Sequence, residues 1–169
     1  MSMIEIAKRF IRKGLLPVPV PKGSKAPRIK GWNDLEILEA EVEKYFSEDC
    51  NVGLILGRES NGSLVDIDLD TKEAIEAAPY YLPETPSIHG RSSKPNSHYW
   101  YKADPIPKPK KFLDIDGTCL LEIRSTGQQT IVPPSTHPSG EKIDWCPNGG
   151  KPSEQHGELL TTAAQRTAA

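Results

Sequence analysis

The sequence predicts an α+β domain in which helices cover one face of a sheet and leave the other face open for chemistry. Helical spacing of apolar residues occurs near the N-terminus and again at residues 71–78. Short strand patterns, separated by Gly, Pro, Ser and Asn, fill the middle of the chain. The length of 169 residues fits one domain of ordinary size.

The first part of the chain predicts two helices and an edge strand. Ser2 and Glu5 have capping-box spacing and Gly14 stands where a helix commonly ends, which predicts a helix over residues 3–13. Residues 16–20 are apolar but include two prolines, a pattern typical of an edge strand, and they lead into a basic loop. Apolar residues at positions 38, 42, 45 and 46 predict a second helix.

Six short segments in the rest of the chain predict strands. They cover residues 52–56, 64–68, 98–102, 120–124, 129–132 and 142–145. A helix is expected over residues 71–78, directly after the second of these strands. Residues from 149 onward predict a polar linker that runs into a short Ala-rich segment.

Composition predicts a cytoplasmic location without a membrane partner. No apolar run approaches the roughly 18 residues that cross a bilayer, and the N-terminus lacks the apolar segment of a signal peptide. Cys50, Cys119 and Cys146 lie far apart, so we expect reduced thiols. The net charge of -2 does not indicate nucleic-acid binding, but a global sum can conceal a basic surface.

The stretch LVDIDLD at residues 64–70 places three carboxylates on one face of an extended strand. Like charges at this spacing repel, and a divalent cation with oxygen ligands, magnesium or manganese, is the usual compensation. Asp70 stands three residues before Glu73, so we expect it to cap the following helix. For Asp66 and Asp68 two interpretations stay open, namely metal ligands or the solvated face of a half-buried strand.

The strand expected at residues 120–124 presents Glu122 and Arg124 on the same side. Glu122 completes a three-carboxylate site with Asp66 and Asp68 if the two strands are neighbours. A surface ion pair with Arg124 is the alternative.

His98 and Trp100 point to the same side of another predicted strand. The preceding loop, residues 90–94, is flexible and cationic and therefore suited to holding phosphates. A lone histidine in a strand is usually a packed or surface residue, so the interest of His98 depends on this loop.

A second acidic motif at residues 114–118 matches the D-x-D-G-T opening of haloacid-dehalogenase-type phosphatases. In that family the first Asp, here Asp114, is the nucleophile. The further acidic pair that such enzymes need does not follow in the sequence. Turn chemistry that leads into the next strand is the interpretation we favour.

Several short motifs occur in a defined order along the chain. They are K-A-P at 25–27, G-W at 31–32, N-V-G at 51–53, Gly57, V-D-I-D at 65–68, Gly90, His98, L-E-I-R at 121–124, P-P-S-T-H-P-S-G at 133–140 and Trp145. This set, which spans most of residues 5–146, resembles the bifunctional primase-polymerase domain of the archaeo-eukaryotic primase superfamily. Such domains occur in replication proteins of plasmids, phages and other mobile elements.

The resemblance implies an RRM-like antiparallel-sheet catalytic core combined with a small N-terminal α/β subdomain. The catalytic domain would occupy residues 1–150, with an N-terminal module of about 1–57 and a catalytic module of about 58–150. Residues 151–169 would form a linker or the start of a C-terminal accessory helix. The loop at 90–97 departs from the family pattern, because Lys94-Pro95 replaces a glycine-rich run.

The resemblance also implies roles for single residues. Asp66, Asp68 and Glu122 correspond to the acids that bind two Mg²⁺ or Mn²⁺ ions, and His98 to a contact with the nucleotide phosphates. We expect His98, Arg91 and Arg124 to offset triphosphate charge and Ser92 to bind the nucleotide from the same loop as Arg91. Ser135 and His137 either touch the nucleotide or belong to a rigid turn. Template binding would use basic loop residues, unless they are simply solvated, at Lys22, Lys25, Arg28, Lys30, Lys108, Lys110 and Lys111.

The sequence therefore predicts a DNA-dependent primase and polymerase. It would join nucleoside triphosphates (dNTP, NTP or both) on a single-stranded DNA template by a two-metal mechanism, with a helicase domain or subunit as partner. Two alternatives stay open, a catalytically inactive nucleotide-binding or nucleic-acid-binding module of the same fold and a phosphatase that uses Asp114.

Overall fold

The computed structural model describes all 169 residues as a mixed α+β protein with two sheets. Its α-helices are α1 (Met3–Arg12), α2 (Val42–Tyr45), α3 (Lys72–Tyr81) and α4 (Gly157–Thr167), and short 3₁₀ turns span Trp32–Asp34, Glu39–Glu41 and Glu59–Asn61. Its strands are β1 (Pro17–Pro21), β2 (Cys50–Ile55), β3 (Leu64–Leu69), β4 (Ile88–Arg91), β5 (Lys94–Ala103), β6 (Lys110–Leu113), β7 (Cys119–Arg124), β8 (Gln129–Ile131), β9 (Asp144–Trp145) and β10 (Ser153–Gln155).

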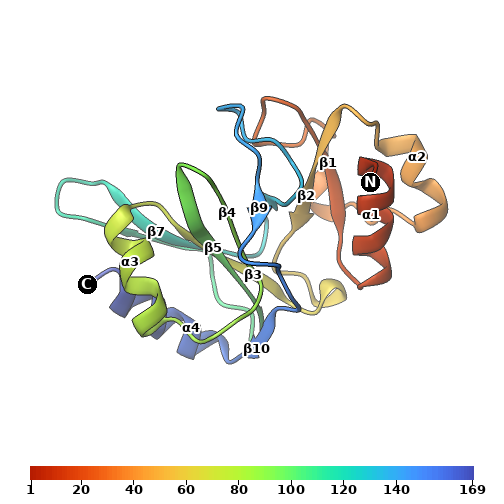
Figure 1. The fold of residues 1–169 in the computed structure, drawn as a ribbon. Helices are drawn as coiled ribbons and strands as arrows, with labels where there is room; N and C mark the ends of the chain where they lie inside the picture. Colours follow the sequence, from red (N-terminus) through yellow and green to blue (C-terminus); the bar gives the residue numbers. More distant parts are fainter.

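The larger sheet has seven strands and the smaller one three. The larger has the order β6-β7-β3-β5-β4-β9, with β10 paired to β5, and all of its pairs are antiparallel except β10 with β5. The smaller has the order β1-β2-β8. Since β8 comes from late in the sequence, it brings this part of the chain next to the N-terminal strands (Figure 1).

The N-terminal elements form largely as the sequence predicts. The Ser2 hydroxyl accepts a hydrogen bond from the Glu5 N–H at 3.2 Å, which confirms the cap of α1. The proline-containing β1 pairs only with β2 and is an edge strand, as expected. The second predicted helix is shorter than its apolar spacing indicates, because a 3₁₀ turn precedes the single turn of α2.

Strict alternation along β3 separates an apolar face from an acidic one. Val65, Ile67 and Leu69 are fully buried and pack in one core cluster with residues of α3 and α4. The two helices cover this face of the sheet, and Figure 1 shows them side by side. Asp66 and Asp68 therefore lie on the opposite face, away from the helices.

The predicted cap of α3 is wrong. The side chain that accepts from the Ala74 N–H, at 3.2 Å, belongs to Thr71 rather than to Asp70. The helix begins at Lys72, one residue later than the cap prediction required, and the extended backbone of Thr71 fits the N-cap position. Asp70 is exposed and pairs instead with Lys94 across 3.2 Å.

Strands β4, β6 and β10 have no counterpart among the predicted strands. They are short, and Gly90, Pro109 or Pro152 lies within or next to each, so no alternating apolar pattern marks them. Residues 151–169 contain β10 and α4, and Leu160, Ala163 and Ala164 of α4 belong to the same core cluster as β3. None of the helices has the length and apolar character needed to cross a membrane.

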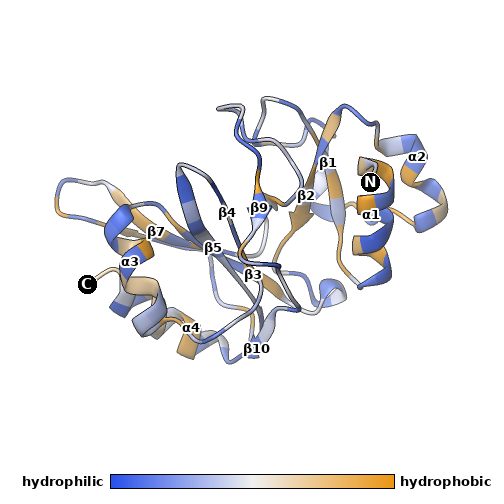
Figure 2. Cartoon of the chain, viewed as in Figure 1, coloured by the Kyte–Doolittle hydropathy of each residue, from blue (hydrophilic) through white to orange (hydrophobic).

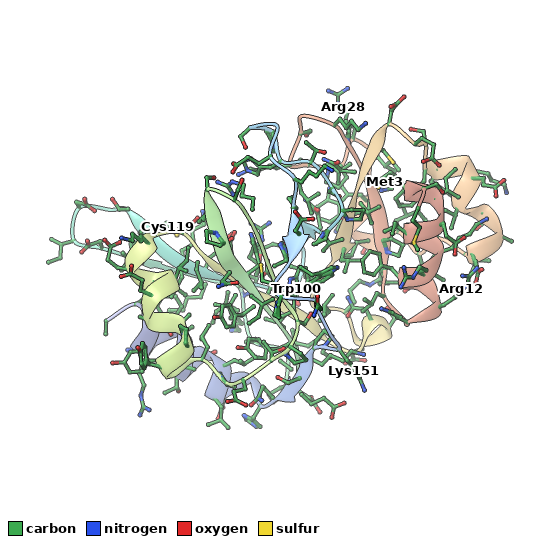
Figure 3. The ribbon with its side chains drawn as sticks, viewed as in Figure 1. Met3, Arg12, Arg28, Trp100, Cys119 and Lys151 are labelled. Atoms are coloured by element: carbon green, nitrogen blue, oxygen red, sulfur yellow. The ribbon has the colours of Figure 1, made fainter.

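A second core cluster combines residues of α1, α2 and β2 with residues of the larger sheet. Ala7 and Phe10 of α1 pack there with Leu64, Trp100 and Val132, so the cluster joins segments far apart in sequence. Trp100 is 1% exposed and lies near the middle of the molecule (Figure 3), and burying so large a side chain contributes about 2–3 kcal/mol. Figure 2 shows hydrophobic residues along β2 and hydrophilic ones at the tip of the hairpin between β4 and β5.

Candidate active site

A polar pocket of about 130 Å³ opens where β8 of the smaller sheet meets β3, β4, β5 and β7 of the larger one. Ile131 and Ile143 are its only apolar lining residues. The other lining residues are Lys25, Asp68, Asp70, His89, Gly90, Arg91, Lys94, Ser97, His98, Arg124, Gln129, Thr130 and His137. Six of these come from the site residues predicted by sequence: Lys25, Asp68, Arg91, His98, Arg124 and His137.

Strand register brings the predicted acids and bases together. β3 lies between β5 and β7, so Asp68 is directly opposite His98 on one side and Glu122 on the other. Asp66 is opposite Arg124 in the same way. Side chains directly opposite in a sheet contact one another, so the register alone places acids and bases next to each other.

Acidic and basic side chains alternate across this face. The Nδ1 of His98 is 2.9 Å from Asp66 Oδ2, and its Nε2 is 3.6 Å from Asp68 Oδ1. Arg124 Nη1 is 3.7 Å from Asp68 Oδ2 and 2.6 Å from Glu122 Oε1. Neighbouring side chains on this face therefore follow the order Asp66, His98, Asp68, Arg124, Glu122. Because a base lies between each acid and the next, β3 can carry two carboxylates close to a third on β7.

Asp66 is the most deeply buried of the acids, at 0% exposure. Besides His98, it accepts a hydrogen bond from the Thr130 hydroxyl at 2.7 Å. Because Thr130 is on β8, this bond connects the two sheets beneath the pocket. Asp68 and Glu122 are more accessible, although Glu122 does not line the pocket and its second oxygen is 3.9 Å from Lys111 Nζ.

The pKa values of Asp68 and His98 reflect this crowding. Burial raises the pKa of Asp68, His98 opposes that effect, and the charge of Asp66 raises it further. Burial alone would lower the pKa of His98, but the charges of Asp68 and Asp66 outweigh it, so its pKa lies above the ordinary value. These charges favour the protonated form of His98, which neutralises part of the acidic face.

His89 is a pocket residue that sequence reasoning missed. Its ring stacks on His98 with centroids 4.4 Å apart, and it is 1% exposed with no protein partner for either ring nitrogen. Burial, followed by the charge of His98, lowers its pKa well below the ordinary value, so the ring is neutral. The sequence would have identified His89 only if residues 88–91 had been predicted to form a hairpin with the strand that carries His98, since His89 is directly opposite His98 in that hairpin.

The cationic loop turns sharply between β4 and β5. A Cβ on Gly90 would lie 2.5 Å from the Lys94 carbonyl oxygen, so this close approach requires glycine. Arg91 and Lys94 line the pocket, but Ser92 does not. The Ser92 hydroxyl donates instead to Glu141 at 2.9 Å.

The segment after β8 divides into a structural half and a pocket half. Ser135 is fully buried, its hydroxyl accepts from the Val52 N–H at 3.0 Å and donates to the Val52 carbonyl at 3.2 Å, and it does not line the pocket. For Ser135 these contacts are those of a structural turn. His137, two residues later, does line the pocket.

The predicted template lysines are dispersed over the surface. Lys25 reaches the pocket because the Gln129 side chain donates to its carbonyl at 2.6 Å. Lys22 lies on the N-terminal side, 3.5 Å from Asp49, beside a second hollow that Arg28 also lines. On β6, the Lys110 ammonium lies 4.7 Å from the centroid of the Phe112 ring, and Lys111 is exposed. Lys108, just before β6, and Lys30, in the loop after β1, are also exposed.

Asp114 belongs to an exposed turn between β6 and β7. Its carboxylate accepts from the neighbouring Ile115 N–H at 2.7 Å, and the Gly117 N–H donates to its carbonyl at 3.0 Å. It does not line the pocket. These contacts are the ones expected if Asp114 only stabilises the turn. They supply no base or phosphate-binding group next to Asp114.

The chemistry of the donor set fits a hard divalent cation. Asp66, Asp68 and Glu122 offer only carboxylate oxygens, on two hydrogen-bonded strands. The charge of Asp66 already raises the pKa of buried Asp68, and a cation would relieve that repulsion. As arranged, no three acidic, His or Cys side chains form a metal-binding group, since His98 and Arg124 lie between the acids.

Comparison with known proteins gives one family. The family model described as bifunctional DNA primase/polymerase, N-terminal, matches residues 7–158. The match spans both sheets and every residue that lines the pocket. No curated protein matches the chain significantly.

Proposed function

The chain belongs to the bifunctional DNA primase/polymerase family, and from this premise we propose that it forms phosphodiester bonds from nucleoside triphosphates on a DNA template. Membership in the family implies a DNA template and nucleotide substrates. The observation that carries the proposal for this chain is the register of β3, which brings Asp66 and Asp68 next to His98 and Glu122, and of these four residues Asp68 and His98 line the polar pocket. The pocket opens on the sheet face opposite α3 and α4.

The acidic residues would hold the divalent cations that the family generally uses. Asp66, Asp68 and Glu122 would supply carboxylate oxygens, and we propose two Mg²⁺ or Mn²⁺ ions. Such ions, when bound, stabilise the attacking and leaving oxygens of an in-line displacement at phosphorus. Arg124 then has a second role, because it can leave the acids and pair with phosphate oxygens.

The basic residues of the pocket would bind the triphosphate. Arg91, Lys94 and His98 line one wall, formed by the hairpin of β4 and β5. Protonated His98 and the guanidinium of Arg91 are charge-assisted donors of the kind that bind phosphate strongly. His98 also orients Asp66 through its Nδ1, so it connects the acids with the phosphate side of the pocket.

Finer features of the proposal concern architecture and partners. We propose that the larger sheet is an RRM-like catalytic core, that residues of about 1–57 form a smaller module beside it, and that exposed lysines such as Lys25 and Lys111 contact the template. The packing of α1 against Leu64 and Trp100 supports a fixed arrangement of the two modules. A helicase domain or subunit is the partner that we expect to unwind the template.

Primer extension and primer synthesis on single-stranded DNA, with Mg²⁺ or Mn²⁺, test the proposal. Asp66→Asn and Asp68→Asn should each reduce incorporation at least about a hundredfold, because each removes a charged oxygen ligand. Asp114→Asn is the matched control and should leave the rate unchanged. Full activity in Asp66→Asn, or loss of activity in Asp114→Asn, would contradict the assignment.

One observation favours the alternative of an inactive binding module. Each acid already has partners within the protein: His98 and Thr130 for Asp66, His98 and Arg124 for Asp68, and Arg124 for Glu122. Titration with Mn²⁺ separates the alternatives, because the enzyme must take up the ion and the Asp68→Asn variant must lose it. A wild-type protein that binds nucleotide but neither takes up Mn²⁺ nor extends primers is the binding module.

A further inference from the structure

Glu141 does not line the pocket, yet its carboxylate accepts hydrogen bonds from five donors around it. Oε1 accepts from the Ser92 hydroxyl at 2.9 Å and the Ser93 N–H at 2.7 Å. Oε2 accepts from Arg91 Nε at 3.0 Å, the Ser93 hydroxyl at 2.8 Å and the Ser139 hydroxyl at 2.9 Å. A carboxylate has about four lone-pair sites, so this one is saturated.

These contacts join two loops that are distant in sequence. Arg91 ends β4, Ser92 and Ser93 form the turn between β4 and β5, and Ser139 belongs to the segment that follows β8. The donors hold the pKa of Glu141 at about 2, with the Ser93 hydroxyl as the largest cause and the Ser93 N–H as the next. The carboxylate is therefore charged throughout the pH range in which enzymes work.

On one side, Glu141 fixes Arg91 in a way that leaves most of its donors free. A guanidinium carries five N–H groups, and Glu141 and Ser93 use only the one on Nε. The terminal amino groups make no hydrogen bond within the protein, and Arg91 lines the pocket. Four N–H donors thus remain for an anionic ligand.

On the other side, Glu141 acts on His137 through Ser139. The Ser139 hydroxyl donates to Glu141, and the Ser139 N–H donates to His137 Nδ1 at 3.1 Å. The Ser139 hydroxyl oxygen also lies 2.8 Å from Nδ1. In the tautomer in which Nδ1 accepts from the Ser139 N–H, the neutral ring carries its proton on Nε2, and burial followed by the charge of Arg91 lowers the pKa of His137 and favours the neutral ring. His137 Nε2 is buried, has no protein partner and belongs to a residue that lines the pocket.

We propose that Glu141 is a positioning residue for the nucleotide: it orients Arg91 and His137, from two loops, so that their free N–H groups bind the same triphosphate. The inference rests on the proposed function, because it takes the pocket ligand to be a nucleoside triphosphate. Glu141 itself stays outside the pocket and does not touch the ligand.

The test compares Glu141→Gln with Glu158→Gln, an exposed carboxylate in the first turn of α4. Gln keeps the size of the side chain but loses the charge and offers one acceptor oxygen to five donors. We expect Glu141→Gln to raise KM for dNTP and the Kd of a labelled dNTP about tenfold, a factor typical of losing contacts that orient a charged donor, with kcat within about twofold. Glu158→Gln should match the wild type in all three.

A double-mutant cycle separates positioning from a general structural role. In an Arg91→Ala/His137→Ala background, Glu141→Gln should change the Kd less than about twofold, because the residues through which it acts are gone. An unchanged KM and Kd in the single variant would overturn the inference, as would an equal loss of binding in the double-alanine background.

A second variant covers the case in which Glu141→Gln does not fold, which circular dichroism will show. Ser139→Ala breaks only the connection to His137 and should raise the Kd about threefold, an effect that His137→Ala abolishes; no effect on the Kd overturns the inference. A wild-type protein that binds dNTP without incorporating it counts against the polymerase proposal alone. A wild-type protein that binds no nucleoside triphosphate overturns both.

Discussion

Replacing Thr130 by Val should weaken the protein at the point where the two sheets meet over the acidic face. Val has the shape of Thr and keeps the β-branch that suits β8, so the backbone of the strand is preserved. The substitution removes the hydroxyl that donates to the fully buried Asp66 at 2.7 Å. Asp66 then keeps only His98 as a partner.

The magnitude follows from the kind of bond that is lost. A hydrogen bond to a charged group contributes about 1.5–3 kcal/mol. The new methyl group, at a site that is 7% exposed, returns about 0.8 kcal/mol of hydrophobic burial. The net loss of unfolding free energy is therefore about 1–2 kcal/mol, which for a chain of this length lowers Tm by roughly 3–6 °C.

Urea denaturation followed by circular dichroism measures this loss directly. With a typical m value of about 2 kcal/mol/M, the midpoint should fall by roughly 0.5–1 M at unchanged m. Thr118→Val is the matched control, because Thr118 is exposed in the turn before β7, so the same substitution there removes a hydroxyl that is open to solvent. If both variants shift the midpoint equally, or Thr130→Val does not shift it, the Asp66–Thr130 bond does not stabilise the contact between the sheets.

Three further predictions concern single sites. Thr71→Ala should cost about 1 kcal/mol of unfolding free energy, because Thr71 caps α3, whereas Asp70→Ala should cost less in the same urea titration. Gly57→Ala should cost more than about 2 kcal/mol, because φ is +64° and the new Cβ would overlap the Thr126 backbone; an unchanged midpoint would refute this. Because burial depresses the pKa of His89 below its ordinary 6.5, the unfolded state takes up a proton that the folded state does not, so the contribution of His89 to stability falls as the pH drops below that value. The raised pKa of His98 acts in the opposite direction, so the two proteins are compared: relative to the wild type, His89→Phe should gain stability in urea midpoints as the pH falls from about 7.5 to 5.

Local rules were sufficient for much of the fold. The Ser2 cap, the proline-containing edge strand and the strands with clear alternation appear where the sequence predicts them. They depend on neighbours within a few residues, so composition and spacing contain the information. The cap of α3 was misplaced by one residue because Asp70 and Thr71 are both good caps and only the position of the first helical residue decides between them.

The candidate site shows the same division. The faces of β3 and β7 follow from the two-residue period of a strand, so the sequence alone places Asp66 with Asp68 and Glu122 with Arg124. The position of β3 between β5 and β7 depends on contacts between distant segments. From the sequence, a site shared by Asp66, Asp68 and Glu122 could therefore be predicted only on the condition that their strands are neighbours. The buried His89 and the carboxylate of Glu141 have no pattern around them and could not be identified before the hairpin and the two loops were seen together.

The sequence by itself determined the first helix, the strands with clear alternation and the separation of their acidic from their apolar faces, and the order of motifs that indicates the family. Only the tertiary structure decided which charges meet: that His98 and Arg124 separate the acids, that Ser135 is bound to the backbone of β2, and that Glu141 joins two loops. The physical reason is the range of the interactions. Caps and alternation act over one to four residues, whereas pairing of strands and ion pairs between loops joins residues tens of positions apart, and these pairings exist only once the chain has folded.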